Sequence, residues 1–183
     1  SRQSIVSSRS FGSPVCSFNL LNESIHEYGS RAAARMRSMK LVCSSLSVYL
    51  CTNRFKDEPQ YSNSASVSLE YPTDSSRIIT AQAEVILKSI YKSGYNYKKT
   101  GIMLHGLTQC SEQQMPLFEK NDYVKRDEKL MNVMDSINRR YGSKSVILAS
   151  EGIRQNWQMK REFLTPGYTT RWSDIPLVKV ESR

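Results

Sequence analysis

The spacing of apolar residues changes along the chain, and this change limits the folds it can adopt. Between residues 42 and 51 every second residue falls on one side, with Leu46, Val48 and Leu50 together. A period of two is typical of a β-strand whose two faces meet different surroundings. The segments before and after this run repeat their apolar residues every three or four positions, which is the period of an amphipathic helix. The chain is therefore expected to combine both elements in one α+β domain.

Two helical stripes are separated by this strand. The first stripe comprises Leu21, Ile25, Tyr28, Ala32, Met36 and Met39, and Asn19 or Asn22 is expected to cap it. The second stripe comprises Ile79, Ala83, Ile86 and Ile90; it follows a break at residues 72–74, which offers a cap, and closes near Gly94.

Three further segments complete the predicted sheet. Residues 8–12 are expected to form a short edge strand, and residues 97–104 the last strand. Between them, residues 64–71 alternate again. One side carries Ala65, Val67, Leu69 and Tyr71, and the other carries Ser64, Ser66, Ser68 and Glu70. The order βαββαβ predicts a four-stranded antiparallel sheet with both helices on one face.

The uncovered face of this sheet has an unusual predicted composition. Its expected occupants are Ser45, Ser47, Ser64, Ser66 and Ser68, with Arg9, Lys98 and Lys99 near the edges. Hydroxyl and cationic groups can bind phosphate oxygens, whereas base stacking needs aromatic rings, and Tyr49 is the one obvious ring. With a net charge of +9 and a pI near 9.5, the chain is expected to bind a nucleic-acid backbone without sequence preference.

Beyond residue 108 the sequence becomes polar. Residues 109–126 have the composition of a linker, within which Gln114, Leu117 and Phe118 form a short peptide suited to an apolar pocket on a partner protein. The alternative is a local turn that buries Leu117 and Phe118 in the chain's own core. Residues 127–183 are expected to form a mixed helix and strand extension, with a helical stripe at Leu130, Val133, Met134, Ile137 and Tyr141 and a strand at residues 146–149.

The same residues argue against catalysis and metal binding. The carboxylates are scattered, whereas nucleotidyl transfer needs a cluster of them to hold divalent cations. His26 and His105 lack a nucleophile partner by spacing, and the four cysteines lack the spacing of a zinc site. Unpaired cysteines favour a reducing cytoplasm, and neither a membrane span nor a signal peptide is expected. Because the chain begins at Ser1 without methionine, a fragment is expected.

Several blocks, taken together and in this order, resemble a known family. They are residues 8–12, 61–67, 97–104, 130–135, 157–161 and 168–171. This series is similar to the C-terminal part of UmuC-type proteins, the catalytic subunits of bacterial polymerase V and its plasmid-borne relatives in the Y family of translesion polymerases.

The resemblance implies a role for each region. Residues 1–108 would be the little-finger domain that grips primer-template DNA, and Arg9 would contact phosphate. The implied DNA-binding residues are Arg9, Ser10, Ser62, Asn63, Ser64, Ser66, Lys98, Lys99 and Thr100. Gln114, Leu117 and Phe118 would bind the sliding clamp, and the family tail is associated with UmuD-type accessory subunits and the RecA filament. The catalytic palm, which would need Mg²⁺, is absent from this chain, so no cofactor and no catalytic residue is expected here.

Two other functions remain open at this point. One is a free-standing RNA-binding module of the same topology, which would show base specificity for single strands. The other is a protein-interaction adaptor whose basic charge serves solubility. The preferred prediction is a non-catalytic DNA-grip and clamp-tethering segment of an error-prone polymerase that acts in SOS mutagenesis.

Overall fold

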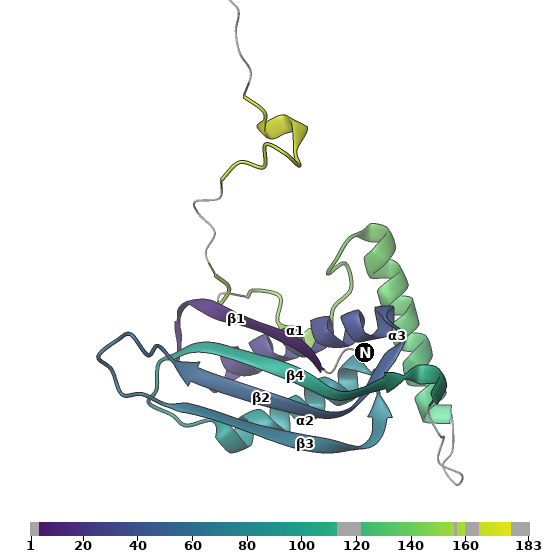
Figure 1. Cartoon of the computed structure of the whole chain (residues 1–183), viewed down its shortest axis with the longest axis horizontal. Coiled ribbons are helices and arrows are strands. Elements are labelled where there is room, and N and C mark those ends of the chain that lie inside the picture. Colours follow the sequence, from purple (N-terminus) through teal and green to yellow (C-terminus); the bar gives the residue numbers. More distant parts are fainter. Residues whose placement is uncertain (1–3, 113–121, 156, 160–164, 177–183) are drawn as a thin grey trace, which may run out of the picture.

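A computed structural model describes residues 4–112, 122–155, 157–159 and 165–176 of the chain. The elements follow in the order β1 (Ser4–Val15), α1 (Phe18–Ser38), β2 (Leu41–Thr52), β3 (Ser62–Thr73), α2 (Ser76–Ile90), β4 (Tyr97–Gln109), η1 (Cys110–Glu112), α3 (Asp122–Tyr141), η2 (Ala149–Glu151) and η3 (Trp172–Asp174) (Figure 1). None of the helices in the described ranges is long and apolar enough to cross a membrane.

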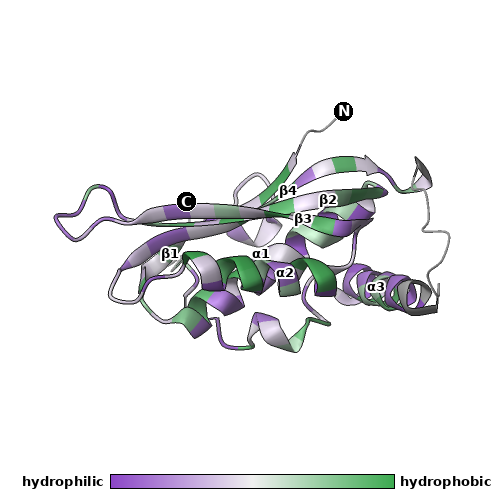
Figure 2. Cartoon of the chain, turned by 90° about the horizontal axis from the view of Figure 1, so that it is seen from below, coloured by the Kyte–Doolittle hydropathy of each residue, from purple (hydrophilic) through white to green (hydrophobic). Residues whose placement is uncertain are grey.

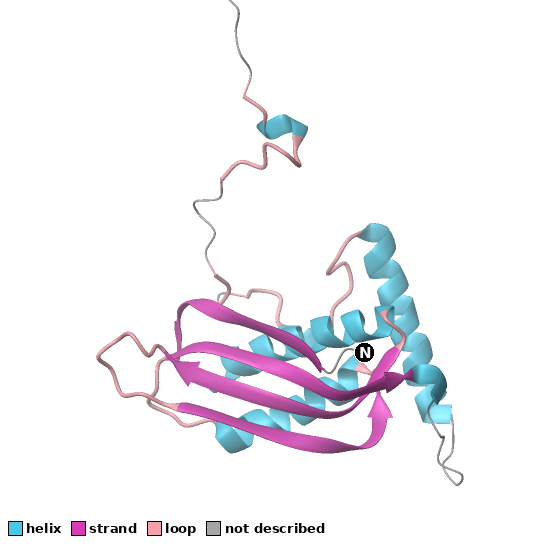
Figure 3. Cartoon of the chain, viewed as in Figure 1, coloured by secondary structure: helices cyan, strands magenta, loops and turns pink. Residues whose placement is uncertain are grey.

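The predicted βαββαβ sheet is confirmed. Its four strands lie in the order β1-β4-β2-β3, and every neighbouring pair is antiparallel. Both α1 and α2 cover the same face of the sheet, and the opposite face carries no helix (Figures 2 and 3). The strands are longer than predicted, because β1 already begins at Ser4 and β4 continues to Gln109.

The core fills the space between the sheet and the two helices. Strand residues that point toward the helices are fully buried, including Leu46, Val48 and Leu50 of β2. They meet the predicted helical stripes, whose buried members include Leu21, Ile25, Tyr28, Ala32 and Met36 on α1 and Ile79, Ala83, Ile86 and Ile90 on α2. At about 25 cal/mol per Å² of buried apolar surface, this layer is the main stabilising contribution to the domain.

Both helices begin at serines rather than at the predicted caps. The backbone of Ser17 is extended and its carbonyl accepts a hydrogen bond from the Leu21 amide (3.2 Å), so Asn19 and Asn22 lie inside α1. At α2 the Ser75 hydroxyl accepts from the Ile78 amide (3.5 Å), one residue after the break expected to supply the cap. The Ser75 hydroxyl thereby satisfies an amide that the first helical turn leaves unpaired, whereas the Ser17 side chain makes no capping hydrogen bond.

The third predicted helix is confirmed as α3, but it packs through a different face than its apolar stripe. Arg37 binds both carboxylate oxygens of Asp135, at 2.7 and 2.9 Å, and Arg77 pairs with Asp127 at 3.0 Å. These pairs turn the stripe outward, so Leu130 and Val133 are 42% and 55% exposed. The docked face of α3 thus combines these ion pairs with Met131, which is 1% exposed.

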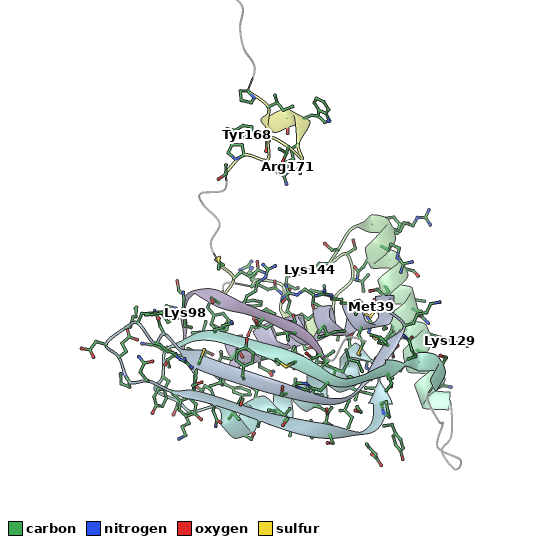
Figure 4. The ribbon with its side chains drawn as sticks, in the orientation of Figure 1. Met39, Lys98, Lys129, Lys144, Tyr168 and Arg171 are labelled. Atoms are coloured by element: carbon green, nitrogen blue, oxygen red, sulfur yellow. The ribbon has the colours of Figure 1, made fainter. Side chains whose placement is uncertain are left out.

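After α3 the chain returns along α1. Residues 146–149 do not form the predicted strand, because both backbone polar groups of Val146 are hydrogen-bonded to the side chain of Asn138. The Asn138 amide nitrogen donates to the Val146 carbonyl, and its oxygen accepts from the Val146 amide, at 2.9 Å each. Lys144 then pairs with the buried Glu27 of α1 at 3.2 Å (Figure 4). Trp157 follows and is 3% exposed. Lys144 and Trp157 of the extension therefore both contact the domain.

The Arg37–Asp135 pair gives a stability prediction. Arg37 has only 8% of its side chain exposed, so removing the opposing charge leaves a guanidinium that water cannot fully solvate. An Asp135→Asn variant is expected to lose about 1–3 kcal/mol of unfolding free energy in urea denaturation. Glu128→Gln on the exposed surface of α3 is the control and should stay within about 0.5 kcal/mol of the wild type. An equally stable Asp135→Asn protein would show that this pair does not dock α3.

Candidate nucleic-acid interface

The uncovered face of the sheet is a regular array of small polar side chains. Because side chains alternate along each strand, the residues between the buried Leu46, Val48 and Leu50 of β2 point away from the helices. Strand pairing aligns these positions in four rows across β1, β4, β2 and β3. The rows are Ser4, His105, Ser45 and Ser68; Val6, Met103, Ser47 and Ser66; Ser8, Gly101, Tyr49 and Ser64; and Ser10, Lys99, Cys51 and Ser62.

The charge of this face, called the serine face below, has one sign. Serine occupies nine of the sixteen positions, and none of the sixteen is a carboxylate; the exposed Glu70 of β3 lies just beyond these rows, two residues after Ser68. Lys99 supplies a positive charge, with its ammonium 5.9 Å from the ring centroid of Tyr49. A surface of hydroxyl donors beside a cation suits an anionic chain with repeating acceptor oxygens.

The missing side chain of Gly101 leaves room for the Tyr49 ring to lie against the sheet. A β-carbon at Gly101 would meet the Ser8 β-carbon at 2.4 Å and the Tyr49 ring at 2.8 Å. The ring of Tyr49 therefore lies across the glycine, in the gap that a side chain would otherwise fill. The one aromatic ring of the serine face is thus packed along the sheet, which leaves the surface low and flat.

The serines predicted for this face are confirmed in position, and two polar contacts add detail. Ser62, Ser64, Ser66 and Ser68 of the edge strand β3 are exposed, and Ser10 and Lys99 are partly exposed. The Ser47 hydroxyl lies 2.9 Å from Nε2 of His105. Ser8, His105 and Met103 also belong to the face but were not predicted. Ser8 could have been predicted, because it lies an odd number of residues from the buried Ile5 and Phe11 and therefore points to the opposite face.

Arg9 and Lys98 do not lie on the serine face. Arg9 has the same phase as Ile5 and Phe11, so it leaves the outer edge of β1 on the helix side. Lys98 alternates with Lys99 along β4, so it lies on the helix side with the buried Thr100 while Lys99 lies on the serine face. The Lys98 ammonium donates instead to the carbonyl of Phe11 at 2.7 Å (Figure 4).

Thr100 and Asn63 also point toward the helix side. Thr100 is fully buried, and its hydroxyl donates to the Tyr49 carbonyl at 2.7 Å. Asn63 pairs with Leu50 across the strands, and its amide donates to the Tyr61 hydroxyl at 3.0 Å. Neither residue belongs to the serine face, and their role in DNA binding stays a prediction.

Arg9 instead lines a cavity of about 340 Å³ under the edge of β1, together with Tyr28, Arg31 and Trp157. The Tyr28 hydroxyl has no hydrogen-bond partner among the described residues. Burial raises the pKa of Tyr28 well above its usual range, so the phenol stays protonated at neutral pH. This cavity shares Ser10 with the serine face, and the rest of its lining belongs to the contact between the domain and its extension.

Two further points concern the predicted clamp-binding peptide and possible metal ligands. Gln114, Leu117 and Phe118, the predicted clamp-binding residues, lie outside the described residues. Within the described ranges there is no group of three or more histidine, cysteine, aspartate or glutamate residues placed to hold a metal ion.

Comparison with known proteins gives two family matches. Residues 2–117 match the impB/mucB/samB family C-terminal domain, and residues 128–178 match a domain of unknown function (DUF4113). Two solved structures show partial likeness, each at low identity. The little finger domain of PolIV in complex with the beta-clamp processivity factor gives a TM-score of 0.45 at 14% identity, covering 63% of this chain and 99% of that one. A chimeric Y-family DNA polymerase gives 0.46 at 12%, covering 60% and 30%. Because both scores are below 0.5, the fold assignment rests on the strand order itself.

Curated relatives match almost the whole chain. SamB of Salmonella typhimurium is 39% identical over 98% of this chain, and UmuC of the same species is 38% identical over 97%. MucB of Escherichia coli is 33% identical over 98%. The chain spans 42% of the length of each of these relatives. The match over residues 2–117 covers more than half of the sequence, and the chain therefore belongs to the impB/mucB/samB family, whose C-terminal domain it contains.

Proposed function

We propose that this chain is the DNA-gripping and clamp-tethering segment of an error-prone translesion DNA polymerase, and that the catalytic reaction belongs to the part of the longer protein that is not present here. The serine face carries this proposal, because it offers hydroxyl donors and a cation without any carboxylate. The relatives are more than twice as long as this chain, which leaves room for a catalytic region outside it.

The shape and charge of the serine face favour a sugar-phosphate backbone as its ligand. Short side chains and the packed Tyr49 ring let a phosphodiester chain lie close to the strands, within reach of the serine hydroxyls and Lys99. Phosphate contacts of this kind fix the position of a duplex and carry no base information. A polymerase segment that follows any template needs that property.

The same geometry disfavours the RNA-binding alternative. Recognition of single-stranded RNA on a sheet of this topology uses exposed rings on which bases stack. On the serine face the ring of Tyr49 covers Gly101 instead. Preferential binding of single-stranded RNA would nevertheless favour that alternative over the DNA grip, and a lack of nucleic-acid binding at low salt would favour the protein adaptor.

Lys99→Met tests the cation of the serine face. Loss of one phosphate contact should weaken binding to primer-template DNA and reduce the slope of log K against log salt by about 1. Fluorescence anisotropy with labelled DNA across a salt series measures both quantities. Lys129→Met on the exposed surface of α3 is the matched control and should leave the slope unchanged. An unchanged slope for Lys99→Met would place the DNA contacts elsewhere.

Ser66→Asp tests whether DNA binding requires the serine face to be free of carboxylates. A negative charge near a DNA phosphate costs roughly 1 kcal/mol or more, so affinity should fall about fivefold or further at low salt. Ser66→Ala removes the hydroxyl without adding charge and should bind almost as well as the wild type. Equal affinities for the two variants would mean that DNA does not approach β3.

The clamp tether is tested independently of DNA binding. We expect a Leu117→Ala/Phe118→Ala variant to lose binding to the sliding clamp, since the two apolar side chains supply the anchor. Pro116→Ala serves as the control and should retain clamp binding. A pull-down with purified clamp is the measurement, and DNA affinity of the double variant should be unaltered. Retained clamp binding by the double variant would reject Gln114, Leu117 and Phe118 as the tether.

A further inference from the structure

The C-terminal extension contacts β1 where β1 loses its regular partner. Pairing between β1 and β4 is continuous from Ser4 to Ser10, and the next pair joins Val15 to Tyr97. The stretch 11–14 between these pairs therefore lacks regular ladder contacts with β4. It directly follows Arg9 and Ser10, two of the residues implied to contact DNA.

Contacts from β4 and from the extension hold this stretch. The Lys98 ammonium of β4 donates to the Phe11 carbonyl at 2.7 Å. From the extension, the Trp157 carbonyl accepts a hydrogen bond from the Gly12 amide at 3.4 Å. The ring of Trp157 also packs edge-on against Phe11, with ring centroids 6.2 Å apart. The extension thus supplies one backbone bond and one aromatic contact to β1.

Trp157 is itself fixed from α1. Its ring meets Tyr28 edge-on at 5.6 Å, and only 3% of its surface is exposed. The chain leading to Trp157 is tied to α1 by Lys144, whose ammonium pairs with Glu27 at 3.2 Å and donates to Gln155 at 2.9 Å. Trp157 therefore links α1 to β1 through three aromatic rings in series, which are Tyr28, Trp157 and Phe11.

From these contacts we infer that Trp157 is a positioning residue, and that the extension around it acts as a strap that sets the place of Arg9 and Ser10 at the DNA surface. The inference rests on the proposed function. It assigns a task to part of the segment that matches a domain of unknown function. Arg9 leaves the outer edge of β1 beside Trp157, where its guanidinium can meet a phosphate of a strand that crosses this edge.

A double-mutant cycle on the full chain tests the inference. Arg9→Ala is expected to weaken DNA binding, and Trp157→Ala should weaken it as well because Arg9 loses its fixed position. If Trp157 acts through Arg9, the two losses overlap, with a coupling of about threefold or more in affinity. In Trp157→Ala, hydrogen exchange of the Phe11 and Gly12 amides should also accelerate. Trp157→Phe keeps a ring against Phe11 and should recover most of the affinity.

A control separates positioning from a general loss of stability. Leu87 is fully buried on α2, which covers β2 and β3, and Leu87→Ala is a large-to-small core change like Trp157→Ala. Leu87→Ala should lower the free energy of unfolding, and its effect on DNA affinity should add to that of Arg9→Ala without coupling. Additive losses for Trp157 and Arg9, or unchanged exchange at Phe11 and Gly12, would overturn the strap. If Lys99→Met weakens DNA binding and Arg9→Ala does not, the strap is rejected and the DNA grip stands. If neither variant weakens DNA binding, the DNA grip is rejected as well.

Discussion

The pairing of β2 with β4 at the centre of the sheet is the constraint on which the rest of the structure depends. These strands share eleven aligned residue pairs, from Leu41 with Gln109 to Thr52 with Tyr97. Their register decides which side chains meet the helices and which remain outside. A shift by one residue would exchange Leu46, Val48 and Leu50 in the core for Ser45, Ser47 and Tyr49, at a cost comparable to the stability of a whole domain. The hydrophobic core and the serine face are two results of the same register.

Most of the fold was predictable because its signals are local and periodic. The order of the elements and the helix-covered face of the sheet follow from two kinds of pattern. These are the alternation at residues 42–51 and 64–71 and the apolar stripes of α1 and α2. The serines of β2 and β3 were placed correctly for the same reason. The alternation did not decide which of Lys98 and Lys99 faces outward, and the placement of Arg9 was wrong because the short motif around it shows no clear alternation.

The extension was less predictable because side-chain contacts rather than periodicity determine its path. Asn138 replaces a strand partner for Val146, and Asp127 and Asp135 of α3 select polar partners over the apolar stripe of the same helix. Trp157 reaches its place through contacts with residues more than a hundred positions earlier in the chain. No pattern within residues 127–183 indicates that Glu27, Arg37 or Tyr28 is a partner.

The composition of β3 has a consequence for the behaviour of the domain in concentrated solution. Among the described residues β3 is an edge strand, the position in a sheet at which pairing with another copy can begin. Joined sheets become stable when apolar side chains interlock between stacked layers, as in a dry zipper. Ser62, Ser64, Ser66 and Ser68 offer only small hydrated groups for such a layer, and Pro72 lacks an amide donor near the end of the strand. The residues that keep the surface open to a ligand thus also guard the domain against aggregation.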